Sequence, residues 1–276
     1  MHKMLGVVVC VPQDSYIGGP GLSNAIQGTI ITKTFQGFSK FMESYMHNHI
    51  DFIISLGADC KPAYHLKRNN LRIVANPFDW MMCYTLTNVI DIINTRFKTF
   101  FIDIHEDTTR KTRNGCRYII DKKNNFVSMH HFKKNLDVAS QYDAFYDKMK
   151  FRFYRMLEYI NNSENVMFIC NRNEDISNFV KFLKSISEIF DKKYLFINTR
   201  HHDDKSAIAK RTYNISKKID IIEYFFYDVH KKGSAGHSDY WMGNLDNWGI
   251  ILNEYKLSTL FSIQDPQSEA GSCHMD

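Results

Sequence analysis

The sequence predicts an α/β fold of three layers, α/β/α, in which helices cover both faces of a mostly parallel central sheet. Short apolar segments alternate with segments whose apolar residues recur at helical spacing, and this order is typical of parallel strands joined by helices. Two of the short segments, residues 166–170 and 194–198, are apolar almost throughout. Strands buried on both faces have this composition, whereas a half-exposed strand alternates polar and apolar residues.

The chain begins with an apolar run over residues 1–12, which we interpret as a strand. A signal peptide is the alternative, but no small-residue cleavage site follows the run. A loop rich in glycine comes next, and residues 23–48 then predict a helix. The apolar run 52–56 predicts a second strand, and residues 84–97 predict another helix.

The second half of the chain alternates more regularly. Helices are expected near 136–161 and 175–190, and each is followed by one of the two apolar strands named above. A polar, charged segment then leads to a further apolar strand, residues 219–229. Strands separated by helices in this way usually lie parallel in one sheet.

Changes in composition suggest the domain organisation. We expect a single α/β domain over residues 1–264, interrupted by a loop-rich insertion at 103–125, where charged and polar residues replace apolar ones. Residues 265–276 are polar and show no periodicity, which predicts a flexible tail.

The overall composition excludes several classes of protein. Apolar residues make up 44% and charged residues 24%, so disorder is not expected. The net charge of +5 is too small to demand a nucleic-acid partner, and no nucleic-acid-binding module is recognisable. No apolar run approaches the roughly 18 residues of a membrane-spanning helix. Six cysteines without regular spacing predict neither a disulfide framework nor a zinc ribbon, so a reducing, cytoplasmic location fits best.

One cysteine, Cys60, differs from the others by its position. The strand 52–56 ends at Gly57, and Pro62 is tolerated only in the first turn of a following helix. Cys60 therefore lies at or just before a helix N-terminus, where backbone N–H groups and the helix dipole favour a thiolate and can bind an oxyanion. This position suits a nucleophile. The alternative is a structural thiol at the start of a helix.

The residues around Cys60 also resemble a known family. The pattern S-L-G-x-x-C-x-x-A-x-x-L from Ser55 to Leu66, followed by Leu71-Arg72 and Pro77-Phe78-Asp79-Trp80, is similar to that of bacterial and viral proteins described as papain-like cysteine peptidases. The resemblance covers most of the chain after about residue 52 and leaves residues 1–51 unmatched. Its weaker parts are the HHF at 130–132, Arg152 and Arg155, Asn171-Arg172, and W-x-G-(x)4-W at Trp241, Gly243 and Trp248.

The resemblance implies a cysteine nucleophile at Cys60, a histidine partner and an acidic residue that orients the histidine. His130 and His131 are the first candidates for the partner, because they follow an apolar pair that suggests the end of a strand and lie in a matching block. The family pattern places an acidic residue after the histidine, so His131 departs from it and both imidazoles stay open as candidates. His237, in a glycine-rich loop, is the runner-up.

Asp79 is our candidate for the acidic residue. Pro77 fixes the backbone ahead of it, and the aromatic residues on either side can hold the turn in the core. The alternative is an aspartate that accepts backbone N–H bonds in its own turn. For substrate binding we consider basic and aromatic residues in or near the matched blocks: Lys67, Arg72, Trp80, Arg172 and Trp241.

These residues lead to a first hypothesis of a cysteine-dependent hydrolase, nominally a peptidase or amidase, acting on a peptide or small molecule without cofactor or metal. A second hypothesis is an acyl- or glycan-modifying transferase of surface polysaccharide biosynthesis that uses the same thiol. Its phosphorylated glycan donor would be held by the basic residues between 110 and 123. A third is a binding protein that keeps the fold without catalysis.

Overall fold

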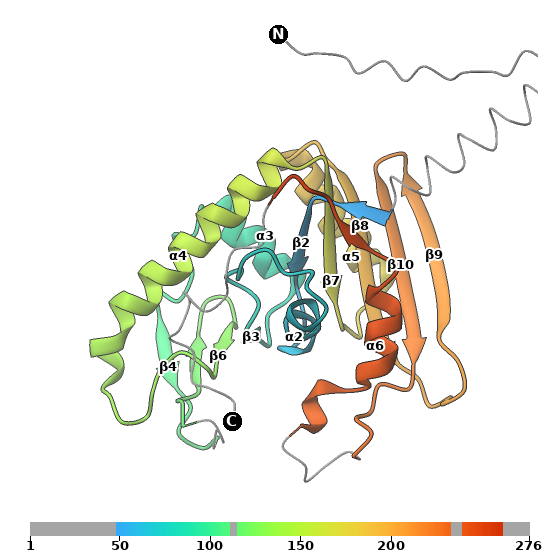
Figure 1. Cartoon of the computed structure of the whole chain (residues 1–276). Coiled ribbons are helices and arrows are strands. Elements are labelled where there is room, and N and C mark those ends of the chain that lie inside the picture. The colour runs from blue at the N-terminus through green and yellow to red at the C-terminus, as the bar shows by residue number, and fades with distance from the viewer. Residues whose placement is uncertain (1–47, 111–114, 233–238, 262–276) are drawn as a thin grey trace, which may run out of the picture. The chain divides into compact units, whose positions relative to one another are not determined.

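A five-stranded sheet, in the order β2-β7-β8-β10-β9, forms the centre of the computed structural model (Figure 1). The structure describes residues 48–110, 115–232 and 239–261, which belong to one compact unit, residues 46–276. Neighbouring strands of the sheet are parallel except β9, which runs antiparallel to β10. The strands are β2 (Phe52–Ser55), β7 (Asn165–Cys170), β8 (Lys193–His201), β9 (Ala209–Ser216) and β10 (Ile219–Phe226).

Helices cover both faces of this sheet. Successive strand residues point to opposite faces, so that Ile54 belongs to one apolar core and Ile53 to the other. The fold is therefore the predicted α/β arrangement with a mostly parallel central sheet. The first core packs against α3 (Leu86–Asn94), α4 (Val138–Asn162) and α5 (Ile176–Ile189), and the second against α2 (Lys61–Arg68) and α6 (Leu245–Leu252).

Side-chain caps explain where several helices begin. Asp137 precedes α4 and Asp175 precedes α5, and each carboxylate accepts a hydrogen bond from a backbone N–H of the first turn. Thr85 caps α3 in the same way, in a capping box with Asn88. These caps satisfy N–H groups that the helix itself leaves without a partner.

Two smaller sheets and a short helix complete the described part of the chain. A four-stranded antiparallel sheet has the order β3-β6-β5-β4, and a parallel pair joins β1 to β11. The elements are β1 (His49–Ile50), β3 (Met81–Met82), β4 (Ile104–Glu106), β5 (Ile119–Asp121), β6 (Val127–Ser128), β11 (Lys256–Leu257) and the 3-10 helix η1 (Tyr240–Met242).

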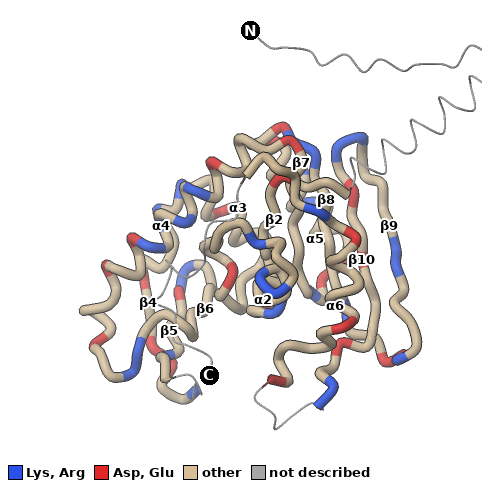
Figure 2. Tube along the Cα trace, viewed as in Figure 1, with Lys and Arg blue, Asp and Glu red and all other residues tan. Residues whose placement is uncertain are grey.

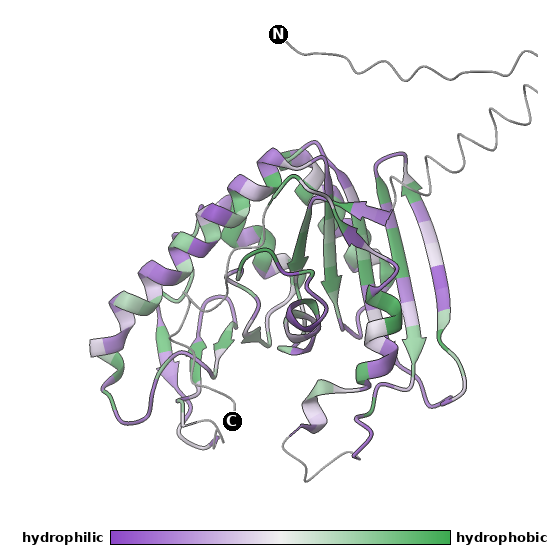
Figure 3. Ribbon diagram, in the orientation of Figure 1, coloured by the Kyte–Doolittle hydropathy of each residue, from purple (hydrophilic) through white to green (hydrophobic). Residues whose placement is uncertain are grey.

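The predicted helices and apolar strands after residue 52 are present within a few residues of their expected ends. The polar segment before β10 is the main difference, because it forms a strand, β9, that is not predicted from the sequence. β9 lies at the edge of the sheet and is mostly exposed, so it lacks the apolar run that marks the buried strands. Figure 3 shows this contrast between the green central strands and the paler, more purple β9.

Two kinds of prediction remain: the insertion at 103–125, and those that lie outside the described residues. The stretch 103–125, expected to be rich in loops, contributes β4 and β5 to the small antiparallel sheet. The expected strand at 1–12, the helix over 23–48 up to residue 47, the tail at 265–276 and His237 lie outside the described residues.

Candidate active site

Cys60 lies between the end of β2 and the start of α2. Residues 56–59 make the turn, and Pro62 occupies the first turn of the helix, as expected. Gly57 allows the tight turn, because a Cβ atom at that position would lie 2.2 Å from the backbone oxygen of Asp59. The thiol is 7% exposed, so the chain places it under other residues and not on the open surface.

The Cys60 thiol meets an imidazole from another part of the chain. Sγ of Cys60 lies 3.4 Å from Nε2 of His130, and 70 residues separate the two in sequence. His130 follows β6 of the small antiparallel sheet, whereas Cys60 follows β2 of the central sheet. The ring of Trp80 packs edge-on against His130 at 5.7 Å. The contact between Cys60 and His130 therefore requires the central sheet and the small antiparallel sheet to lie next to each other.

The neighbouring histidine has a different environment. Nδ1 of His131 is hydrogen-bonded to the Ser128 hydroxyl at 2.8 Å, and its ring lies 5.4 Å from that of Phe145 in α4. Of the adjacent pair that the sequence leaves open, His130 is the one whose imidazole contacts the sulfur. His65, which follows Cys60 on α2, turns to the backbone oxygen of Met242 and makes no such contact.

The protonation states of the pair follow mainly from burial. Burial raises the pKa of the Cys60 thiol far above its ordinary value, and the nearby carboxylates of Asp59 and Asp79 raise it further. Burial also lowers the pKa of His130 to about 4. The resting site thus holds a neutral thiol and a neutral imidazole. The expectation of a thiolate stabilised by the helix end fails for the resting state, because the cost of burying a charge is larger.

The side chain of Asp79 stabilises the turn in which the residue itself lies. Its Oδ2 accepts a hydrogen bond from the backbone N–H of Asn76 at 2.9 Å and lies 3.5 Å from Nη1 of Arg72. The turn contact that the sequence offers as an alternative role is therefore present. The same carboxylate also acts electrostatically on Cys60, so Asp79 belongs to the surroundings of the thiol.

Fewer backbone amides are available at the helix start than the sequence suggests. The N–H of Lys61 donates to Oδ1 of Asp59 at 2.8 Å, and Pro62 has no N–H to offer. The N–H of Ala58 donates to the side chain of Asn171 at 2.9 Å. Among residues 60–62 at the helix start, the amide of Cys60 is therefore the one that can bind an oxyanion.

Two residues after β7 support the turn that leads to Cys60. Asn171 makes two hydrogen bonds to the turn. Its Oδ1 accepts from the N–H of Ala58 at 2.9 Å, and its Nδ2 donates to Oδ1 of Asp59 at 3.0 Å. Arg172 is 4% exposed and donates to the backbone oxygens of Leu56 and Tyr84, both at 2.8 Å. The guanidinium therefore joins the end of β2 to the segment before α3.

The other candidates for substrate binding lie in varied surroundings. Arg72 is paired with Asp79, as described, and Lys67 is exposed on α2. Trp241 packs edge-on against Tyr64 of α2 at 5.0 Å.

Three of the basic residues of the middle segment, Arg110, Arg117 and Lys122, are paired with carboxylates. Figure 2 shows basic and acidic residues together in this part of the chain. The contacts are Arg117 with Glu106 at 2.8 Å, Lys122 with Asp103 at 3.1 Å and Arg110 with Asp107 at 3.3 Å. These ion pairs reduce the positive charge that a phosphorylated donor would need.

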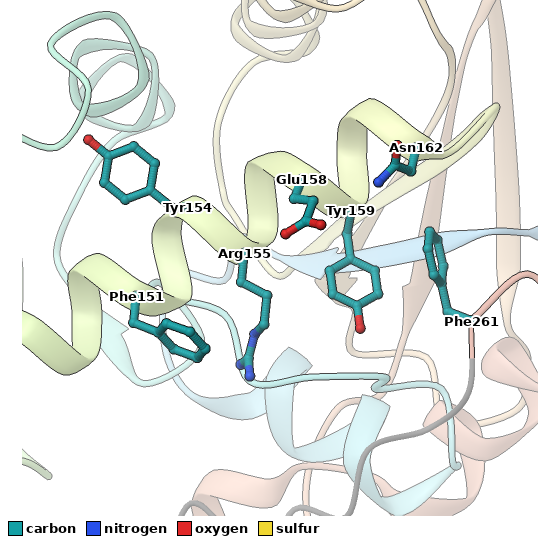
Figure 4. A pocket seen from close by; sticks show the side chains of 7 residues that line it. All are labelled: Phe151, Tyr154, Arg155, Glu158, Tyr159, Asn162 and Phe261. Atoms are coloured by element: carbon teal, nitrogen blue, oxygen red, sulfur yellow. The ribbon is translucent and has the colours of Figure 1, made fainter.

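A pocket of about 460 Å³ lies elsewhere, along α4 (Figure 4). Its walls include Phe151, Tyr154, Tyr159 and Phe261, and neither Cys60 nor His130 lines it. The pocket thus does not belong to the thiol site.

Three cysteines among the described residues have free thiols. Cys83 is exposed, Cys170 is buried at the end of β7, and Cys60 is the thiol that meets an imidazole. Cys116 is disulfide-bonded, a pairing that the irregular spacing of the cysteines does not predict. Within the described ranges, no group of three or more His, Cys, Asp or Glu side chains could hold a metal ion. No helix in the same ranges is both long and apolar enough to cross a membrane.

Comparisons with known proteins agree with the geometry of the site. The chain is 27% identical over 222 residues to "Uncharacterized protein R408" of Acanthamoeba polyphaga mimivirus, an alignment that covers 73% of this chain and 97% of the viral protein. No solved structure matches the chain. The family described as "Putative papain-like cysteine peptidase (DUF1796)" matches residues 51–205, more than half of the chain and the part that contains Cys60 and His130. The chain therefore belongs to the family that carries this description.

Proposed function

We propose that the protein is a cysteine-dependent hydrolase of peptide or amide bonds, with Cys60 as the nucleophile and His130 as the general base and acid. The contact of 3.4 Å between Sγ of Cys60 and Nε2 of His130 carries the proposal. A thiol beside an imidazole at the start of a helix is the arrangement that activates a cysteine nucleophile. Membership of the peptidase family agrees with this role.

The first half of the reaction starts from the neutral pair. Nε2 of His130 takes the proton of the Cys60 thiol as Sγ attacks the carbonyl carbon of the substrate. A C–S bond forms, and the carbonyl oxygen becomes an oxyanion that the N–H of Cys60 can bind. The imidazolium then gives its proton to the leaving amine, the C–N bond breaks, and a thioester remains on Cys60.

The second half releases the product. His130, neutral again, takes a proton from a water molecule, and the resulting hydroxide attacks the thioester carbon. The C–S bond breaks, the sulfur recovers the proton from the imidazolium, and the carboxylic acid leaves. Electrons and protons balance over the two halves, so no cofactor is required.

Two further residues have roles in this proposal. The edge of Trp80 packs against His130 and limits the rotation of the imidazole. The carboxylate of Asp79, immediately before Trp80 in the sequence, is buried and supplies negative charge near the reacting groups. This charge disfavours the thiolate at rest but favours the imidazolium that forms during the reaction.

Hydrolysis is favoured over transfer from a phosphorylated donor by the charges of the middle segment. Three of the basic residues that would hold a phosphate, Arg110, Arg117 and Lys122, are engaged with carboxylates. A surface built of neutralised pairs attracts a polyanion weakly. A peptide or amide substrate makes no such demand on these residues.

The proposal can be tested without knowledge of the natural substrate. Small p-nitrophenyl esters serve as general acyl donors, and the protein is quenched in acid and analysed by mass spectrometry. We expect the acyl group on Cys60, its loss in Cys60→Ala, and a large reduction in His130→Ala. Cys83→Ala is the matched control, because Cys83 is an exposed thiol outside the site, and this variant should acylate normally.

Acylation that appears on Cys83 or on lysines, and that persists in Cys60→Ala, would exclude the proposed nucleophile. The transferase hypothesis has its own outcome in the same experiment. There the Cys60 thioester would persist in water and disappear only after an acceptor amine or alcohol is added.

A further inference from the structure

A buried ion pair ties the helix that follows the nucleophile to the end of β10. Nζ of Lys61 lies 2.7 Å from Oδ2 of Asp228, and the two side chains are 14% and 7% exposed. Lys61 directly follows Cys60, and Asp228 comes two residues after the end of β10. The pair therefore acts at the first turn of α2, next to the thiol.

The carboxylate of Asp228 is held in place by further donors. Its Oδ1 accepts from the backbone N–H of Asn244 at 2.8 Å and from Nε1 of Trp248 at 3.1 Å. Gly243 makes this approach possible, because a Cβ atom there would lie 2.0 Å from Oδ1 of Asp228. Gly243 also has a φ of 67°, which favours glycine. The glycine and second tryptophan of the W-x-G-(x)4-W pattern thus serve to position one carboxylate.

The second turn of α2 contacts the same segment. His65 lies one turn after Lys61, donates from Nε2 to the backbone oxygen of Met242 at 2.8 Å, and stacks on Trp248 at 4.4 Å. The first tryptophan of the pattern, Trp241, packs on Tyr64. Asp228, Trp241, Met242 and Trp248 thus contact α2 along its length, and Asp228 provides the contact nearest to Cys60.

We infer that Asp228 is a positioning residue for the nucleophile, which acts through Lys61 to hold Sγ of Cys60 against His130. The inference rests on the proposed function. The cysteine side chain is short, so its sulfur follows any shift of the helix start. A separation of 3.4 Å leaves little room for such a shift. Removal of the carboxylate would leave the Lys61 ammonium without its partner in a largely buried position, and the first turn would move to hydrate it.

The test measures how strongly His130 assists Cys60, with and without Asp228. Rates of alkylation by iodoacetamide are followed at the Cys60 peptide, with the exposed Cys83 as internal reference. We expect His130→Ala to slow the labelling of Cys60 by about tenfold or more in the wild-type background. In Asp228→Asn and in Lys61→Met, the same His130→Ala change should alter the rate by less than about twofold, since the sulfur no longer meets the imidazole.

The matched control is Asp191→Asn, which removes a carboxylate from the exposed pair with Lys218. This control should keep the full effect of His130. A purely structural role of Asp228 would lower the melting temperature and leave the dependence on His130 intact, and that result would overturn the inference.

A second measurement separates the inference from the proposed function. Hydrogen exchange of the peptide that spans α2 should be faster in Asp228→Asn than in Asp191→Asn, whatever the role of His130. Unchanged exchange in α2 would refute the positioning role. If His130→Ala has no effect in the wild-type background, the proposed function fails, and the exchange experiment alone decides whether Asp228 holds the helix.

Discussion

The carboxylate of Asp59 caps the helix end beside which Cys60 lies: its Oδ1 accepts the hydrogen bond of the Lys61 amide at 2.8 Å. An anion thus already occupies the helix end that would otherwise stabilise a thiolate. Together with burial, this charge keeps the thiol neutral in the resting protein. In the proposed mechanism, the reactivity of Cys60 therefore depends on proton transfer to His130 and not on a preformed thiolate.

Neutralising Asp59 should make Cys60 more reactive. Asp59→Asn keeps an oxygen that can accept from Lys61 but removes the charge that raises the pKa of the thiol, so this pKa should fall. We expect alkylation of Cys60 at neutral pH to become faster by up to about tenfold. The measurement is the pH profile of Cys60 alkylation, with Asp191→Asn as the control. Identical profiles for wild type and Asp59→Asn would show that the charge has no influence.

Acid should destabilise the protein through its buried histidines. Burial lowers the pKa of His130 and of His65 to about 4, whereas an unfolded histidine titrates near 6.5. The unfolded state therefore binds protons first as the pH falls. The stabilising contribution is complete above about 6.5 and is lost between about 6.5 and 4, on the order of 3 kcal/mol per histidine.

Urea unfolding across this pH range measures the effect. His65→Gln should flatten the dependence of the unfolding free energy on pH, because one of the buried imidazoles is removed. His202→Gln is the matched control, since His202 is exposed, and it should keep the wild-type slope. An equal slope in all three proteins would contradict the role of the buried imidazoles.

A side chain at Gly57 should disrupt the turn at the nucleophile. In Gly57→Ala the new Cβ meets the backbone oxygen of Asp59 at 2.2 Å, so the turn must move and Cys60 with it. We expect a loss of about 2 kcal/mol or more in unfolding free energy and a loss of acylation at Cys60. Gly249→Ala is the control, because its nearest neighbour would be 3.9 Å away in the interior of α6. That change should be neutral or stabilising, and an equal loss in both variants would refute the steric account.

Arg172 should be important for stability. Arg172→Lys cannot reach Leu56 and Tyr84 together, so at least one buried backbone oxygen loses its donor. We expect a loss of about 2–4 kcal/mol in unfolding free energy, measured by chemical denaturation. Arg110→Lys, with a side chain that is 61% exposed, serves as the control and should change little. A stable Arg172→Lys with weaker substrate binding would instead assign the guanidinium to the substrate.

The strands that are buried on both faces can be predicted from the sequence. β7 and β8 are apolar because both of their faces are covered, and a simple scan finds them. β9 escapes such a scan because exposed edge residues need not be apolar. β9 pairs with β10 through backbone hydrogen bonds, and these do not require a particular side-chain composition.

Of the candidate site, the position of the thiol can be predicted from the sequence, but its histidine partner cannot. Gly57, Cys60 and Pro62 lie close in sequence, and their local order predicts the thiol at a helix start. The choice between His130 and His131 depends on packing, because one imidazole lies against Trp80 and the other against Phe145, far along the chain.

The role of Asp228 also depends on tertiary packing and cannot be predicted from the sequence. Its partners Lys61 and Trp248 come from distant segments, so no local pattern marks the carboxylate. The protonation state of the thiol is also hidden from the sequence. A helix end can be predicted from residue types, but the depth of burial that outweighs it cannot.

The separation of 70 residues between Cys60 and His130 has a consequence during synthesis. A nascent chain that has just exposed its thiol has no imidazole in place, and the small sheet that carries His130 must be translated and docked first. In the proposed mechanism, a ribosome-bound fragment that ends before His130 thus has the thiol without its general base. Under the proposed mechanism, the capacity to cleave appears only when the tertiary structure is assembled, which links the onset of activity to the completion of folding.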